Sequence, residues 1–178
     1  MAAVAKPKLA QTLPPAAEEE RVRSAGLGQI VVSNAPAEVL VAYGLGSCVG
    51  VVGYDPTNKV AGLLHALLPQ HRYGEKNLAK FVDSGIPQLV LEMEQGGALR
   101  RQVIWYVVGG AEMLKLPGAT SEFNIGAKNS EMARQVMARE GLTPRAVETG
   151  GTSGRTVKVA VRDGAVIVRT LGRDERKL

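Results

Sequence analysis

Two side chains of the sequence could carry out nucleophilic chemistry together. Cys48 is the only cysteine in the chain, and His65 is one of two histidines. A free thiol with a pKa near about 8.5 is only slightly ionised at neutral pH. A neighbouring imidazolium would lower that pKa and give a reactive thiolate. The two residues therefore predict acyl-transfer chemistry, provided that the fold brings them together.

The segment between the two residues predicts such a meeting. Residues 48–54 and 59–68 are apolar and strand-like, and Asp55 and Pro56 favour the first two positions of a type I β-turn. If Asp55 pairs with Asn58, Cys48 lies directly opposite His65, and such cross-strand neighbours have Cβ atoms about 4.5–5.5 Å apart. However, the backbone twist of a type I turn does not match the twist of the two strands that a two-residue loop joins. A compensating bulge would shift the register and separate the pair.

The glycines around the cysteine favour a nucleophile. Gly44, Gly46 and Gly50 leave the backbone uncrowded, so that a carbonyl substrate can approach. The N–H groups near Ser47 and Cys48 are candidates for stabilising an oxyanion, together with the backbone at Gly46. The alternative is a structural role, because a lone intracellular cysteine is usually a small buried apolar side chain.

Four residues are candidates for lining the site. They are Gly44, Asn124, Asn129 and Arg155, which lie in or beside segments rich in glycine. Asparagine and glycine also serve ordinary helix capping and turns, so this alternative stays open. His71, in a charged loop, is interpreted as a solvated side chain.

Other kinds of site fit the sequence less well. Residues 44–50 place Val49 where a dinucleotide-binding fingerprint needs glycine. One cysteine and two histidines cannot complete a four-ligand zinc site without carboxylates at ligand spacing, so neither a metal nor a cofactor is expected. The basic residues are scattered and aromatic residues make up only 4% of the chain, which argues against nucleic-acid binding. The net charge of +5 suits a mildly basic face for an acidic protein partner.

The composition predicts a cytoplasmic protein built around one core. The 178 residues have the size of a single domain, and no apolar run approaches the about 18 residues that a membrane span needs. The first residues do not have the pattern of a secretory signal, and a single cysteine cannot form an internal disulfide. We expect a disordered tail over 1–24, one domain over 25–172 and a charged tail over 173–178.

The periodicity predicts an α+β fold with antiparallel or mixed β-sheet and two helices packed outside. Helices are expected over 76–95 and 124–140. Pro87 predicts that the first is either kinked or divided into two helices, with Asp83 or Ser84 capping the second of these. Besides the segments around Cys48 and His65, strands are expected over 29–33, 38–43, 102–108, 155–161 and 165–171.

The sequence resembles the CheD family, the chemoreceptor glutamine deamidases of bacterial and archaeal chemotaxis. The similarity extends over roughly residues 28–170, and the motifs together are highly specific. In family order they are LGSCVGV (45–51), DP (55–56), H-x-x-LP (65–69), GG (109–110), FNIGAKN (123–129) and GGTSGR (150–155).

The resemblance implies a β-sandwich-like core flanked by helices and related to bacterial deamidating toxins. It implies a protein-glutamine glutaminase, an amidohydrolase in which Cys48 attacks the side-chain amide of a receptor glutamine and His65 acts as base. No cofactor is implied. The implied partners are the cytoplasmic helices of chemoreceptors, with recruitment to receptor arrays but no insertion into the membrane, and a phosphatase of the CheC type.

One position departs from the family. A threonine that orients the histidine commonly stands six residues before the cysteine, whereas this chain has Ala42, which has no hydroxyl group. Losing an orienting group can cost orders of magnitude in rate. This leaves an alternative in which the protein is a weakly catalytic or non-catalytic adaptor that binds CheC and regulates dephosphorylation of the response regulator. A third possibility is an unrelated thiol hydrolase or transamidase that uses the same residues.

Overall fold

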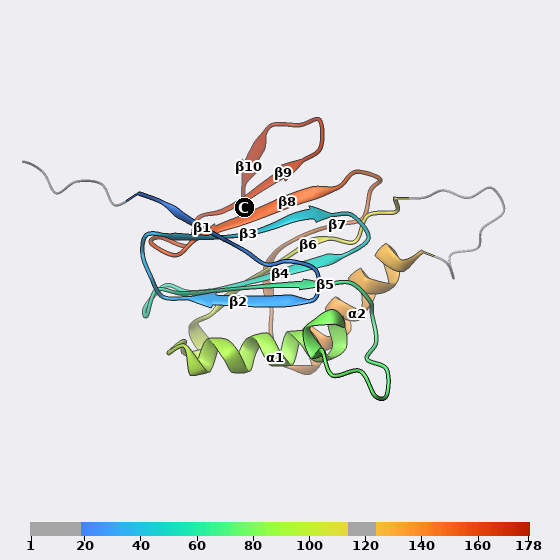
Figure 1. The fold of residues 1–178 in the computed structure, drawn as a ribbon, viewed down its shortest axis with the longest axis horizontal. Coiled ribbons are helices and arrows are strands. Elements are labelled where there is room, and N and C mark those ends of the chain that lie inside the picture. The colour runs from blue at the N-terminus through green and yellow to red at the C-terminus, as the bar shows by residue number, and fades with distance from the viewer. Residues whose placement is uncertain (1–18, 114–123) are drawn as a thin grey trace, which may run out of the picture.

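Two five-stranded sheets lie face to face, and two helices cover the outer face of one of them (Figure 1). The computed structural model describes residues 19–113 and 124–178. Both sheets are mixed, since each contains one parallel pair of strands and is otherwise antiparallel. The predicted α+β class, a sandwich-like core with two main helices, is therefore confirmed.

The sheet beneath the helices contains the strands on both sides of the predicted hairpin. Its strands, in spatial order, are β2 (Gln29–Ser33), β5 (Val60–Ala66), β4 (Val49–Asp55), β6 (Ile104–Gly109) and β7 (Pro144–Thr149). Every residue of β4 and β5 is buried, because one face packs against the helices and the other against the second sheet.

The second sheet closes the other side of the core. Its order is β1 (Arg21–Ser24), β3 (Glu38–Leu45), β8 (Arg155–Ala160), β9 (Val166–Thr170) and β10 (Glu175–Lys177). Its inward side chains form an inner core with those of the first sheet, which includes Leu40, Leu63, Val108, Val157 and Val168. The space between the sheets is thus the layer in which a buried catalytic pair would lie.

The helices largely follow the predicted periodicity. A short helix η1 (Leu78–Lys80) precedes α1 (Val82–Gln95), η2 (Arg100–Gln102) follows, and α2 (Ile125–Arg139) runs beside α1. The expected division into two helices is found, with the break at Phe81, and Pro87 lies inside α1. The predicted cap is wrong, because Phe81 is the N-cap and makes no side-chain capping bond.

The turn between β4 and β5 differs from the prediction. Asp55 pairs with Val60, and the loop holds four residues, with Lys59 in the left-handed region at φ 54°. The longer loop avoids the unfavourable twist of a two-residue type I hairpin. As a result His65 pairs with Gly50, and the predicted pairing of Cys48 directly with His65 is wrong by two residues.

The structure also differs from the predicted boundaries. Residues 21–24, expected in the tail, form β1 and pair in parallel with β3, while residues 175–177 form β10 beside β9. Strand β7 was not predicted at all. The rest of the predicted tail, residues 1–18, lies outside the described residues.

Asp55 should be a main determinant of stability in the β4–β5 hairpin. Its buried carboxylate accepts hydrogen bonds from three backbone N–H groups, those of Thr57 (2.8 Å), Asn58 (3.3 Å) and Leu99 (2.7 Å). We expect Asp55→Ala to lower the free energy of unfolding by about 2–4 kcal/mol, since it removes the acceptor of all three. Urea denaturation measures this loss.

Asp163→Ala is the matched control. The Asp163 carboxylate accepts one exposed bond, from the N–H of Ala165 at 3.0 Å. Its loss should cost less than about 1 kcal/mol. Equal effects of the two substitutions would contradict the role assigned to Asp55.

Candidate active site

The glycine-rich segments predicted to surround the cysteine meet at one end of the sandwich. Backbone hydrogen bonds join them: Gly110 N–H donates to the Cys48 carbonyl (2.7 Å), Ala111 N–H to the Gly46 carbonyl (2.7 Å) and Gly150 N–H to that of Gly109 (3.0 Å). Segments more than 100 residues apart in sequence are thereby fixed around Cys48.

Cys48 and His65 lie on the same face of their sheet. The imidazole of His65 is 2% exposed, and the half-buried thiol packs against the inner core between the sheets. Since Gly50 pairs with His65, Cys48 is the diagonal neighbour of the histidine, a relation with a typical separation of about 7–8 Å. The side chains share a layer without a hydrogen bond between them in the described part of the chain.

A backbone carbonyl orients the imidazole. His65 Nδ1 lies 3.1 Å from the carbonyl oxygen of Ala25, just after β1. Since a carbonyl can only accept, Nδ1 carries the proton and Nε2 keeps its lone pair. Nε2 is buried and has no hydrogen-bond partner among the described residues. The ring is therefore in the tautomer that a general base requires.

Ala42 cannot supply the orienting hydroxyl that the resemblance implies at this position. It is fully buried in the inner core, where β3 pairs it with Val157. The described contact that holds the ring of His65 comes from the Ala25 carbonyl instead.

Burial favours the neutral forms of both groups. It lowers the pKa of His65, an effect that the hydrogen bond to Ala25 partly opposes. Burial also raises the pKa of the Cys48 thiol, against a smaller opposing effect of its own backbone. Both shifts favour a neutral thiol and an uncharged imidazole over the expected pair of thiolate and imidazolium.

Asn129 links the cysteine loop to the histidine strand. This side chain of α2 is fully buried, and its Nδ2 donates to the carbonyls of Ser47 and Leu67, each at 2.8 Å. The Ser47 carbonyl adjoins Cys48, and the Leu67 carbonyl lies two residues after His65. Asn129 thus sets the spacing of the two strands that carry the pair.

Asn124 is further from the pair. Its side chain caps α2 by accepting from Ala127 N–H at 2.9 Å, the ordinary role that the sequence left open. Together with Ser47 it lines a small cavity of about 140 Å³.

Arg155 and the paired glycines hold the other side of the cysteine loop. Arg155 donates through Nη1 to the Gly150 carbonyl (2.9 Å) and, at 3.5 Å, to that of Gly109. Gly109 has φ 115°, and a Cβ atom there would lie 2.3 Å from the Cys48 carbonyl oxygen. Only glycine permits this approach to the cysteine.

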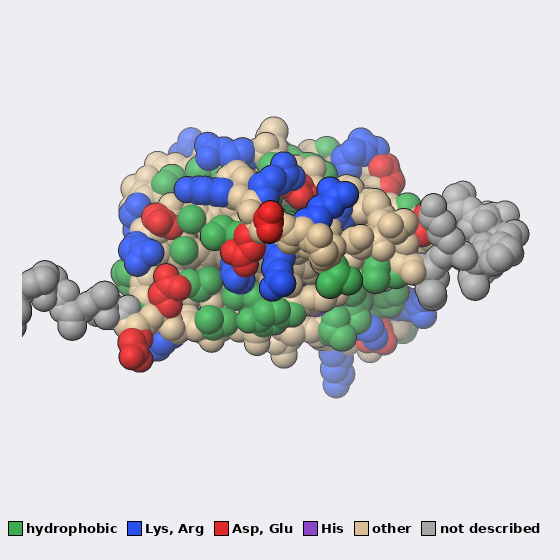
Figure 2. Space-filling view, turned by 90° about the horizontal axis from the view of Figure 1, so that it is seen from above, with side chains coloured by type: hydrophobic (Ala, Val, Ile, Leu, Met, Phe, Trp, Pro, Cys, Tyr) green, Lys and Arg blue, Asp and Glu red, His purple; other side chains and the backbone are tan. Residues whose placement is uncertain are grey.

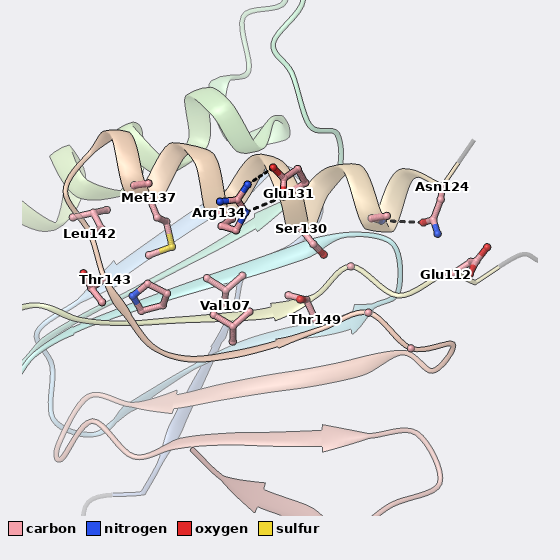
Figure 3. Close-up of a pocket in the computed structure, with 17 residues that line it drawn as sticks. Val107, Glu112, Asn124, Ser130, Glu131, Arg134, Met137, Leu142, Thr143 and Thr149 are labelled. Carbon is pink, nitrogen blue, oxygen red and sulfur yellow. Dashed lines mark hydrogen bonds and ion pairs between the residues drawn. The ribbon is translucent and has the colours of Figure 1, made fainter. Parts of the chain in front are cut away.

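A groove of about 660 Å³ lies on the opposite face of the same sheet, between α2 and β7 (Figure 3). Val107 of β6 and Met137 of α2 line it, and so do Glu131 and Arg134, which form an ion pair. Since Cys48 and His65 face the second sheet, this groove does not receive their side chains.

Sequence reasoning missed two backbone groups of the site, the carbonyls of Ala25 and Leu67. Neither depends on a side chain, so residue type gave no signal for them. In the described ranges, no three His, Cys, Asp or Glu side chains are grouped as metal ligands. No helix of those ranges has the length and apolar character of a membrane-spanning segment.

Asn129→Ala should loosen the cysteine loop. It would leave two carbonyls without their donor, so we expect a loss of about 2–4 kcal/mol in the free energy of unfolding and a faster reaction of Cys48 with iodoacetamide. Urea denaturation and timed alkylation measure the two effects. Asn124→Ala, which removes only a helix cap, should cost about 1 kcal/mol and leave the alkylation rate unchanged. An unchanged alkylation rate in the Asn129 variant would show that the hydrogen bonds of Asn129 do not control the cysteine loop.

Comparisons with known proteins agree with the resemblance. The family model described as CheD chemotactic sensory transduction matches residues 67–170. A protein of Symbiobacterium thermophilum named probable chemoreceptor glutamine deamidase CheD is 39% identical over 163 residues, which cover 90% of this chain and 99% of that protein. A protein of Thermococcus kodakarensis with the same name is 40% identical and covers 81% of this chain and 89% of its own.

Among solved structures, the hypothetical protein YfiH of Bacillus licheniformis aligns with a TM-score of 0.46 and 13% identity. The alignment covers 76% of this chain and 61% of that one.

Proposed function

The chain belongs to the CheD family, and we propose that it hydrolyses the side-chain amides of glutamines in chemoreceptors to glutamate. Cys48 is the nucleophile and His65 the general base. The observation that carries this assignment is the histidine geometry: Nδ1 is bound to the Ala25 carbonyl, and the free Nε2 lies in the layer that also holds the thiol.

The neutral pair dictates how the reaction begins. As the sulfur attacks the amide carbon, His65 Nε2 takes the thiol proton, so that charge separates only along the reaction path. The resulting imidazolium gives this proton to the departing nitrogen, and ammonia leaves a thioester. Water then attacks the thioester carbon while Nε2 accepts a proton from it, and the glutamate and the thiol are released. The sum is one glutamine and one water converted to glutamate and ammonia.

Rotation of the cysteine side chain has to shorten the diagonal separation before proton transfer. Catalytic hydrogen bonds are often long in unliganded enzymes and tighten when substrate binds. Gly50, which pairs with His65, adds no side chain between the two groups. Leu45 covers Gly50, since a Cβ atom there would lie 2.9 Å from Leu45 Cδ1.

A second candidate function is that of an adaptor for a phosphatase of the CheC type, with little catalysis. The raised pKa of the Cys48 thiol and the alanine at position 42 favour it, because both weaken a nucleophile of this kind. Under either function the protein acts in the cytoplasm, where the receptor helices that it recognises are exposed, and recruitment to receptor arrays would concentrate it there.

Cys48→Ala and His65→Gln should each reduce deamidation by at least about 10³-fold, because the nucleophile and the base act in the same step and the loss of either one removes it. The assay incubates receptor cytoplasmic fragments with the protein and follows a mass gain of about 1 Da per converted glutamine, the difference expected for amide hydrolysis. His71→Gln is the control, because His71 lies outside the site and contacts Glu75 and Asp83. Full deamidation by Cys48→Ala would leave the adaptor as the remaining function.

The pH dependence should show a broad plateau. Because the pKa of His65 is lowered, the base stays neutral as the pH falls to below about 6.5. Because the pKa of Cys48 is raised, the pair keeps the proton needed for ammonia release as the pH rises to above about 8.5. We expect kcat/KM to fall only outside this range.

Alkylation of Cys48 by iodoacetamide provides an independent test, since only the thiolate reacts. The rate should rise through a pKa above about 8.5. A titration midpoint below about 6.5 would instead indicate a preformed thiolate–imidazolium pair and refute the neutral pair.

A further inference from the structure

A second, polar hollow opens between the two sheets beside the proposed site. It has a volume of about 670 Å³ and is lined by the ends of β7, β8, β9 and β10 and by the turn at residues 151–153. The side that carries β9 and β10 shows Lys and Arg side chains gathered with Asp and Glu between them (Figure 2). This mixed surface does not form the continuous basic stripe typical of a site for a polyanion.

The charges around the hollow do not cancel in pairs. Arg176 forms an ion pair with Glu148. Arg155 and Arg173 also line it, and neither has a carboxylate partner in the described part of the chain, although the exposed Asp174 lies on the same rim. Two guanidinium groups are thus left to face the hollow with one unpaired acid.

Arg155 is held in place from behind. Its Nη1 is bound to the carbonyls of Gly150 and Gly109, while its Nε is buried without a hydrogen-bond partner among the described residues. Burial lowers the pKa of Arg155, and the charge of Arg173 lowers it further. The two guanidinium groups therefore repel each other, and an anion between them would relieve the repulsion.

The remaining groups of the lining complete an oxyanion site. Thr152, Ser153 and Thr170 contribute hydroxyl groups, which can donate hydrogen bonds to oxygen. Guanidinium groups bind carboxylate and phosphate through two parallel N–H bonds, and they bind most strongly where they are partly desolvated. The ligand class that fits is a single carboxylate or phosphate group.

The hollow lies in the same layer as the catalytic pair. His65 pairs with Gly50, Gly50 with Val108 and Val108 with Glu148, so His65 and Glu148 are the ends of one row across four strands. Paired residues point to the same face, which here is the face toward the second sheet. Three strand spacings separate the ends, roughly 14 Å, a distance that a short peptide can span.

We propose that Arg155 and Arg173 form an anion subsite that binds an acidic side chain of the substrate while a glutamine occupies the site at Cys48. The identity of the anion rests on the proposed deamidase function, but the existence of the subsite does not. A free phosphate has the same binding chemistry, so the test must separate these two sources.

The first arm measures anion binding without catalysis. Isothermal titration with inorganic phosphate should show saturable binding to the unaltered protein. Arg173→Gln, at an exposed position, should weaken binding at least about tenfold, whereas Arg145→Gln, an exposed arginine of β7 outside the hollow, should not change it. Asp174→Asn should strengthen binding, because it removes the competing acid. Arg155→Lys keeps the positive charge but loses the two parallel N–H donors of the guanidinium group, so it should weaken phosphate binding.

The second arm uses peptides that carry one glutamine, with a glutamate placed at successive distances from it or replaced by alanine. At the best spacing, Arg173→Gln should raise KM about tenfold for the acidic peptide and leave both kcat and the KM of the alanine peptide unchanged. Arg145→Gln is again the control.

The outcomes separate the possibilities. If phosphate binding depends on Arg173 but Arg173→Gln does not raise KM for the acidic peptide, the subsite binds a small anion and the acidic side chain is rejected. Absence of both effects would overturn the subsite. If no peptide is deamidated at all, the proposed function fails, while the phosphate titration still decides whether the subsite exists.

Discussion

The hydrogen bond between His65 Nδ1 and the Ala25 carbonyl is the contact on which the chemistry of this site depends. It fixes both the tautomer and the direction of the ring. Ala25 is itself held by the chain on both sides: its N–H donates to the Val41 carbonyl (2.8 Å), and Gly28 N–H donates to the His65 carbonyl (2.8 Å). Strand β1 and the turn that follows it are therefore part of the site, although they carry none of its reactive groups.

The use of a carbonyl in place of a charged or hydroxyl partner has an electrostatic consequence. A carboxylate would stabilise an imidazolium strongly, whereas a carbonyl dipole in a buried layer does so only weakly, and burial lowers the pKa of the ring despite it. In the proposed reaction the pair consequently stays neutral until a substrate develops charge. The rigidity of the surrounding loops then matters. The backbone N–H of Gly110 and the side-chain amide of Asn129 donate to the carbonyls of Cys48 and Ser47, and these bonds must hold the thiol in reach of a base that does not attract it.

The sequence predicted the parts of the fold that rest on periodicity. The buried strand at 104–109 and helix α2, with its cap at Asn124, follow directly from apolar spacing and capping chemistry. It did not predict the edge strands β1, β7 and β10, whose short or polar stretches pair with neighbours that a local pattern cannot reveal. The position of Cys48 relative to His65 was also wrong in detail, because the register depends on whether the loop holds two or four residues. The shift of two kept both side chains on one face, whereas a shift of one would have placed them on opposite faces.

Unpartnered polar atoms mark where this fold gives up stability. Three buried atoms at one end of the sandwich, His65 Nε2, Asn129 Oδ1 and Arg155 Nε, have no hydrogen-bond partner among the described residues. Each such atom costs about 1–3 kcal/mol, so a purely structural core would be more stable with apolar residues there. The cost is understandable if Nε2 has to remain free to take a proton, since any permanent donor to its lone pair would compete with the thiol. The same physical feature that destabilises the resting protein therefore keeps the base available.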